Sequence, residues 1–66
     1  MSLPDALKRF RKAQKLTQKQ ASTAAGVAER VYQSYEYGKV VPTVNVLIAL
    51  ADYFDVSLDY LVGRSD

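Results

Sequence analysis

The chain has 66 residues, which suffices for one small domain. It contains no cysteine and no histidine, which excludes disulfides, thiolate and imidazole metal sites, and the commonest catalytic base. It has neither an apolar run near the roughly 18 residues of a membrane span nor a signal-peptide core, so we expect a cytoplasmic protein. We expect no cofactor, no metal and no enzymatic activity, because the sequence has no glycine-rich phosphate loop and no pair of acids placed for catalysis.

The formal net charge of +2 conceals an uneven distribution. Residues 1–39 hold eight Lys and Arg against three acids, whereas residues 40–66 hold one Arg against four Asp. A basic N-terminal half can meet the phosphates of a nucleic acid. A solvated basic face on the first helix explains the same charges, so the charge distribution alone leaves both interpretations open.

The first two helices are predicted over residues 4–14 and 18–25. Pro4 suits the first turn of a helix, and Thr17 is a good N-cap for the second. Gly26 ends the second helix, because glycine adopts the left-handed conformation without a Cβ penalty. The apolar residues that recur at helical spacing in the first helix are Leu3, Leu7 and Phe10.

The third helix is predicted over residues 28–37, immediately after a short turn. Val31, Tyr32 and Tyr35 are its apolar residues, and Gly38 ends it. A helix, a tight turn and a second helix with an exposed polar start form the arrangement that enters a DNA major groove.

The last two helices are predicted over residues 44–54 and 58–62. Pro42 prevents helix before the fourth, Thr43 caps it, and Gly63 ends the fifth. The fourth helix is expected to be the central core helix because of its apolar residues, which are Val44, Leu47, Ile48, Leu50, Ala51 and Phe54.

The sequence therefore predicts one all-α domain over residues 1–66, with its core at about 4–63. Five helices are expected, and the helix-turn-helix covers about 18–37. We find no repeat, no low-complexity segment and no strand-like alternation.

Several short motifs occur together, in order and without a gap. They are Leu16-Thr17-Gln18, Gly26-Val27, Glu36, Gly38-Lys39, Pro42, Leu47, residues 49–51 and the segment VSLDYL at 56–61. With these motifs the chain resembles the Cro and phage-repressor helix-turn-helix family, the xenobiotic-response-element family of transcriptional regulators. The resemblance implies a compact repressor-like fold that binds double-stranded DNA, usually as a homodimer on a pseudopalindromic operator.

The resemblance also implies which residues contact DNA. Base-edge candidates lie at the start of the third helix and are Ala28, Glu29, Arg30, Gln33 and Ser34. Arg30 can bind guanine O6 and N7, Gln33 adenine, Glu29 cytosine N4 and Ala28 a thymine methyl. Phosphate candidates are Thr17, Gln18, Lys19, Tyr37, Lys39 and Thr43, and the resemblance implies that Gln18 also braces the third helix. Glu29 and Arg30 also suit an ordinary solvated helix start, and both threonines suit capping alone.

Two further expectations rest on the resemblance. Arg11 and Glu36 are expected to form a partly buried structural salt bridge that orients the third helix; otherwise they are two surface charges of little effect. The family usually has aliphatic residues at positions 32 and 35, and leucine at 21. We expect Tyr32 and Tyr35 to fill the space left by Ala21 and its neighbours, with each hydroxyl bonded to a polar group or water.

The last helix has more apolar surface than so short a helix can bury on one face. In the family this region often forms the two-fold dimer interface. We therefore expect the interface to include Leu58, Tyr60, Leu61 and Val62, although these residues can also cover the core of a monomer.

Two functions are compatible with the sequence. The first is a small bacterial or phage transcription regulator, a repressor in the simplest case, that binds duplex DNA with its third helix in the major groove. The second is a protein-interaction module, such as an antitoxin or anti-repressor partner, that uses the same fold. The basic N-terminal half and the polar start of the third helix favour DNA.

Overall fold

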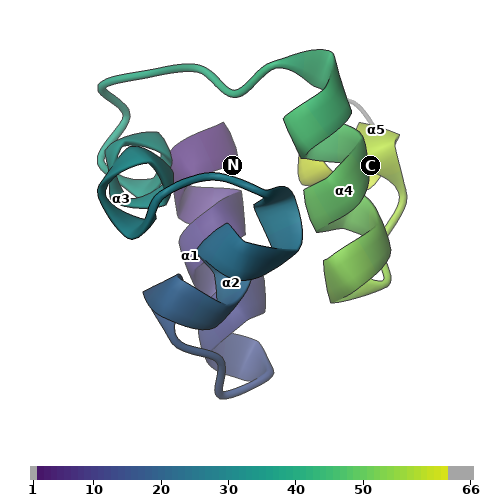
Figure 1. Ribbon diagram of the computed structural model, residues 1–66. Coiled ribbons are helices and arrows are strands. Elements are labelled where there is room, and N and C mark those ends of the chain that lie inside the picture. The colour runs from purple at the N-terminus through teal and green to yellow at the C-terminus, as the bar shows by residue number, and fades with distance from the viewer. Residues whose placement is uncertain (1, 63–66) are drawn as a thin grey trace.

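The computed structural model describes residues 2–62 and contains five α-helices in that range (Figure 1). They are α1 (Leu3–Ala13), α2 (Gln18–Ala25), α3 (Glu29–Glu36), α4 (Val44–Phe54) and α5 (Leu58–Leu61). The all-α prediction is confirmed. Residue 1 and residues 63–66 lie outside the described part, and with them the prediction that Gly63 ends the last helix.

Side-chain caps set where most helices begin. Thr17 accepts a hydrogen bond from the backbone N–H of Gln20, and the Gln20 side chain accepts one from the Thr17 N–H, which completes a capping box. Thr43 and Ser57 cap α4 and α5 in the same way, through single hydroxyl acceptors. Because Thr17 and Thr43 are such strong signals, the predicted and observed bounds of α2 and α4 coincide.

The turn between α2 and α3 depends on Gly26. Its φ of 74° lies in the left-handed region, and the N–H of Val27 donates back to the Ser22 carbonyl at 3.0 Å. Ala28 then begins α3 in an extended conformation without a side-chain cap. Gly38 closes α3 with a φ of 77°. The two glycines therefore fix the ends of the helix pair.

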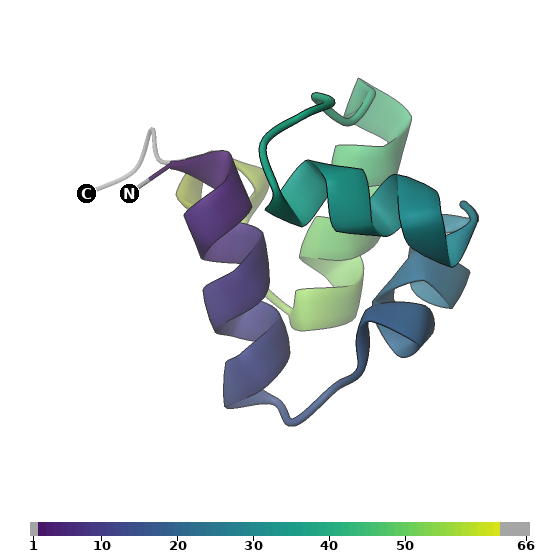
Figure 2. The same ribbon diagram turned by 90° about the vertical axis from the view of Figure 1, so that its left-hand side faces the viewer.

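The helices pack around one core. α2 contacts both α3 and α4, α1 contacts α3, and α5 closes the assembly against α1 and α4. Figure 2 shows α3 crossing in front of α4, with α1 beside it. The fully or nearly fully buried apolar residues are Ala6, Leu7, Ala21, Tyr32, Tyr35, Leu50, Ala51, Phe54 and Leu61. Tyr32 and Tyr35 therefore belong to the core, as expected, and their rings meet edge to face.

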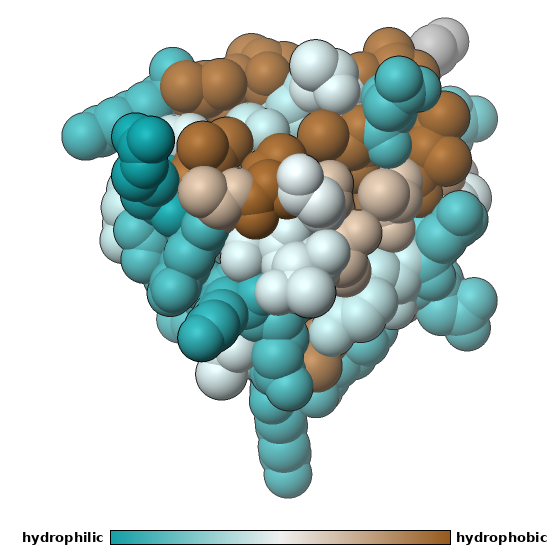
Figure 3. All heavy atoms as spheres, in the orientation of Figure 1, coloured by the Kyte–Doolittle hydropathy of each residue, from teal (hydrophilic) through white to brown (hydrophobic). Residues whose placement is uncertain are grey.

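One part of the core prediction is wrong. Val44 and Ile48 were expected to bury with the rest of α4, but 64% and 44% of their surfaces are exposed. Val40 and Val41 in the preceding loop are exposed as well. Figure 3 shows apolar residues gathered over the upper part of that view, where this loop and the start of α4 lie. α4 is apolar on more of its circumference than the other helices can cover.

Among residues 2–62, none of the helices has the length and hydropathy required to cross a membrane. In the same range, the acidic side chains form no group that could hold a metal ion.

Candidate nucleic-acid interface

A chain of side-chain hydrogen bonds joins α1, α2 and α3. Arg11 of α1 donates from Nε to Glu36 Oε2 at 2.7 Å and from a terminal nitrogen to Glu36 Oε1 at 3.2 Å. Gln18, the first residue of α2, also donates to Glu36 Oε1 at 3.2 Å. Gln33 of α3 then donates to Gln18 Oε1 at 3.0 Å. Three helices therefore share one polar network, which fixes the angle between α2 and α3.

The ion pair at the centre of this network is buried. The Glu36 side chain has no exposed surface, and that of Arg11 is 12% exposed. Arg11 also donates to the backbone carbonyl of Leu16 at 2.8 Å, just before α2. The expected structural salt bridge between Arg11 and Glu36 is present. It is a bidentate, charge-assisted contact, unlike a solvated surface pair.

The environment of Glu36 favours its ionised form. Burial by itself raises the pKa of this carboxyl, but the hydrogen bond from Arg11 and the nearby Tyr32 and Gln18 groups outweigh burial, so its pKa is lowered from 4.5. The same hydrogen bond raises the pKa of Arg11. Both partners therefore stay charged at neutral pH.

A pH dependence of stability follows from the lowered pKa. Since Glu36 titrates lower in the folded chain than in the unfolded chain, its contribution is complete above pH 4.5 and is lost as the pH falls through the folded pKa. We expect urea unfolding to show a decrease in stability on acidification that is smaller in Glu36→Gln. The matched variant Glu29→Gln, at an exposed site, should keep the wild-type dependence. Equal acid profiles of wild type and Glu36→Gln would contradict this assignment.

Tyr32 lies beside the ion pair. Its hydroxyl is buried and has no partner in hydrogen-bond geometry, although burial and the proximity of Glu36 raise the pKa of the phenol. The hydroxyl therefore has no direct partner among the described protein groups, and its expected bond to water stays a prediction. The Tyr32 ring contributes to the core chiefly through its volume, because it occupies space that a smaller aliphatic residue would leave empty.

The outer surface of α3 presents the predicted base-contacting residues. Ala28, Glu29 and Arg30 are exposed in succession at its start. Gln33 and Ser34, one turn further, are half-buried and already bonded, Gln33 to Gln18 and the Ser34 hydroxyl to the Val31 carbonyl. The three exposed residues can reach a ligand directly, whereas Gln33 can offer only the part of its amide that Gln18 does not hold.

The predicted phosphate-contacting residues flank this surface. Thr17, Lys19, Tyr37, Lys39 and Thr43 are all exposed. The two threonine hydroxyls accept capping N–H groups. The Thr43 hydroxyl acts in this cap as an acceptor, so its own proton can be donated to an anion. Capping and anion binding are thus compatible at Thr43.

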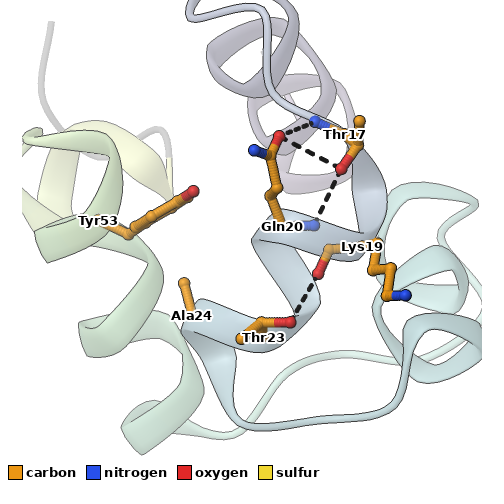
Figure 4. Close-up of a pocket in the computed structure, with 6 residues that line it drawn as sticks. All are labelled: Thr17, Lys19, Gln20, Thr23, Ala24 and Tyr53. Atoms are coloured by element: carbon orange, nitrogen blue, oxygen red, sulfur yellow. Dashed lines mark hydrogen bonds between the residues drawn. The ribbon is translucent and has the colours of Figure 1, made fainter.

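A shallow hollow of about 410 Å³ lies between α2 and α4, next to these residues (Figure 4). Its lining residues are Thr17, Lys19, Gln20, Thr23, Ala24 and Tyr53. The Thr23 hydroxyl donates to the Lys19 carbonyl, and Thr17 and Gln20 bond to each other. Figure 4 shows the Lys19 side chain directed away from Tyr53. Because these polar groups serve α2 itself, the hollow adds no converging group to the interface.

The predicted dimer-interface residues of α5 pack largely against other residues of the same chain. Leu61 has no exposed surface and belongs to the core, which corrects its assignment to an interface. The Tyr60 ring lies against that of Phe10, with centroids 5.5 Å apart. Leu58 and Val62 are half-buried. The monomer therefore covers Leu61 fully and Leu58 and Val62 partly, whereas Tyr60 stays 42% exposed.

Sequence reasoning missed two features of the site. Gln18 was expected to brace the third helix, and it does, but its direct bond to Gln33, fifteen positions further along the chain, was not foreseen. Sequence reasoning also missed the Leu16 carbonyl as a further acceptor for Arg11. No pattern in the sequence signals either contact, because each depends on the relative placement of two helices. The exposed polar residues of α3 needed only the helical repeat.

Known proteins resemble this chain over most of its length. The helix-turn-helix family model matches residues 7–61. YobD of Bacillus subtilis, an uncharacterized HTH-type transcriptional regulator, is 40% identical over 60 residues, which are 91% of this chain and 54% of that protein. RstR, a cryptic phage CTXphi transcriptional repressor of Vibrio cholerae, is 36% identical over 64 residues, 97% of this chain and 57% of that protein. The chain thus spans about half the length of the curated relatives it matches.

Two solved structures share the fold. A transcriptional regulator from Listeria innocua superposes with a TM-score of 0.90 and 32% identity, over 98% of this chain and 61% of that one. The P22 c2 repressor protein, crystallised with a synthetic operator, also gives a TM-score of 0.90, at 23% identity and over 98% of both chains. At that identity the likeness concerns the fold alone. The family match over residues 7–61, together with the five helices and the braced helix pair, shows that this chain belongs to the helix-turn-helix family.

Proposed function

We propose that this chain is the DNA-binding part of a transcription regulator, a repressor in the simplest case. The start of α3 would lie in the major groove, and two copies would bind a pseudopalindromic operator. The observation that carries the proposal is the exposed sequence Ala28-Glu29-Arg30 at the start of a helix that partly buried hydrogen bonds hold at a fixed angle. Such rigidity suits base recognition, since contacts to base edges demand accurate placement.

The surroundings of α3 support the proposal. Lys19 is exposed at the start of α2, Lys39 is exposed just after α3, and Thr17 and Thr43 cap the helices α2 and α4. Ammonium groups and helix N-termini are the usual ligands of backbone phosphates. These contacts would set the register of the protein on the duplex, and the exposed residues of α3 would read the sequence.

A salt titration tests DNA binding directly. We expect the affinity for random duplex to fall linearly in a log–log plot of binding constant against salt, with a slope of several units, because phosphate contacts release counterions. Fluorescence anisotropy of a labelled duplex provides the measurement. If no binding is measurable even at low salt, the interaction-module function is favoured and the proposal fails.

The variant Arg30→Ala tests whether the start of α3 contacts the bases. We expect this variant to lose about 1–3 kcal/mol on its preferred site and much less on random duplex, because a bidentate contact to guanine discriminates between base pairs. Lys19→Ala is the matched control. It should weaken binding to every sequence by a similar factor and reduce the salt slope by about one unit.

The two variants could also behave alike. An Arg30→Ala loss of equal size on specific and random DNA would mean that Arg30 contacts phosphate. α3 would then present a different side chain to the bases, and the base-reading role assigned to Arg30 would be wrong.

A further inference from the structure

The dimer that the proposed function requires needs a contact surface, and α5 offers little. Leu61 is buried, and Tyr60, although 42% exposed, already packs one side of its ring on Phe10. The exposed apolar side chains of the described residues lie mainly elsewhere. Val40, Val41, Val44 and Ile48 are 50%, 81%, 64% and 44% exposed, and they lie in the loop before α4 and in the first half of α4. We call these four residues the α4 surface. Figure 3 shows apolar atoms gathered in this region of the molecule.

The α4 surface continues along one face of the helix. Val44, Ile48 and Asp52 follow one another at intervals of four residues, so they form a single stripe, and all three are exposed. Asn45, also exposed, is the uncharged neighbour of this stripe. Four exposed aliphatic residues gathered in one region are more than single scattered apolar side chains, and an exposed apolar patch marks an interaction site.

The charges at the two ends of this surface indicate what covers it. Lys39 precedes Val40 at one end, and Asp52 follows Ile48 at the other, so the order along the surface is positive, apolar, negative. Two such surfaces complement each other when they meet antiparallel about a two-fold axis. The valines and isoleucines then pack together, and each lysine end faces an aspartate end. A parallel arrangement would oppose like charges instead.

We propose that the α4 surface is the site at which a second copy of this chain docks, in place of α5. This inference rests on the proposed function, since a pseudopalindromic operator requires two copies. Four aliphatic side chains expose far less than the roughly 800 Å² per partner of a standard stable interface, so the dimer is weak by itself. Binding of both copies to adjacent half-sites raises their effective concentration and stabilises the contact.

Lys39 has two proposed roles. It is a candidate phosphate ligand in the proposed function and the positive end of the α4 surface. The roles are compatible, because an ammonium group carries several donors and can serve a phosphate and a carboxylate together. They are also separable, because self-association can be measured without DNA.

Sedimentation equilibrium of the full chain without DNA, over a concentration series, tests the surface. We expect a weak monomer–dimer equilibrium whose association constant falls at least about tenfold in Ile48→Gln, since a buried aliphatic side chain contributes that much. Val62→Asn, on α5, is the control and should leave the association constant unchanged. Thermal melting by circular dichroism should show that both variants stay folded, because both side chains are partly exposed in the monomer.

A charge exchange tests the antiparallel arrangement. Lys39→Asp and Asp52→Lys should each weaken self-association, and the double variant should restore it, because it rebuilds complementary ends with reversed sign. Dimerisation that Val62→Asn disrupts and Ile48→Gln does not would overturn the proposal. Additive losses in the double variant would overturn the antiparallel pairing.

DNA binding supplies the second measurement. On a duplex with two half-sites, Ile48→Gln and Asp52→Lys should abolish cooperativity between copies while binding to a single half-site stays as in the wild type. Unchanged cooperativity would overturn the α4 surface. A wild-type chain that binds no DNA would refute the proposed function, and sedimentation would still decide whether the α4 surface joins two copies.

Discussion

Glu36→Ala is expected to destabilise the chain by about 3–5 kcal/mol, the usual cost of removing one partner of a buried ion pair. Arg11 would keep its charge in a site where only 12% of its side chain is exposed, and Gln18 would lose its acceptor. For a domain this small, such a loss approaches the whole stability, which is about 0.05–0.15 kcal/mol per residue. Urea unfolding at low temperature, where a folded baseline survives, measures it.

The matched control is Glu29→Ala, at the exposed start of α3. It should change the stability by no more than about 0.5 kcal/mol, as surface substitutions usually do. Equal midpoints of unfolding for the two variants would contradict the role of Glu36. A double variant, Arg11→Met with Glu36→Leu, should recover much of the loss, because replacing both charges by apolar groups leaves no buried charge unpaired.

Tyr32→Val is expected to cost about 2–4 kcal/mol, because it removes a ring from a fully buried site and leaves a cavity. Tyr32→Phe removes only the hydroxyl, which has no hydrogen-bond partner among the protein groups of residues 2–62. It should therefore change the stability by less than about 1 kcal/mol, in either direction. Thermal or urea unfolding of the two variants side by side separates the contribution of the ring from that of the hydroxyl.

Other relative stabilities of these two variants would contradict the proposed contribution of the ring. If Tyr32→Phe cost as much as Tyr32→Val, the hydroxyl would be an essential partner of Glu36, and the position could not be explained by volume. If both were neutral, Tyr32 would not fill space left by the small residues of α2. Tyr35→Leu offers a comparison at the neighbouring buried ring, which meets Tyr32 edge to face.

Local signals allowed much of the fold to be predicted. Thr17 and Gly26 flank α2, and Pro42 and Thr43 precede α4. The predicted first and last residues of both helices therefore agree with the structure. α3 was predicted one residue too long at each end, because its flanking residues Ala28 and Tyr37 carry no strong start or stop signal. The Arg11–Glu36 pair was expected from the family resemblance; the spacing of the two residues alone would not have revealed it.

Features that depend on how helices meet could not be predicted. Val44 and Ile48 read as core because α4 is apolar on nearly every side, so periodicity does not show which side faces solvent. Leu61 was assigned to an interface for the converse reason, since a single turn of helix gives no measure of what covers it. The Gln18–Gln33 bond needed the angle between α2 and α3.

Selection of bound sequences from a random duplex pool tests most directly the central claim that the braced helix pair reads DNA. We expect enrichment of two inverted copies of one short motif, with centres about 10 base pairs or a multiple apart, because two copies would present their recognition helices on one side of the duplex. In the same selection, Arg30→Ala should lose the preference for guanine at one position of each half-site. A pool without enrichment, although the chain is folded, would contradict the claim.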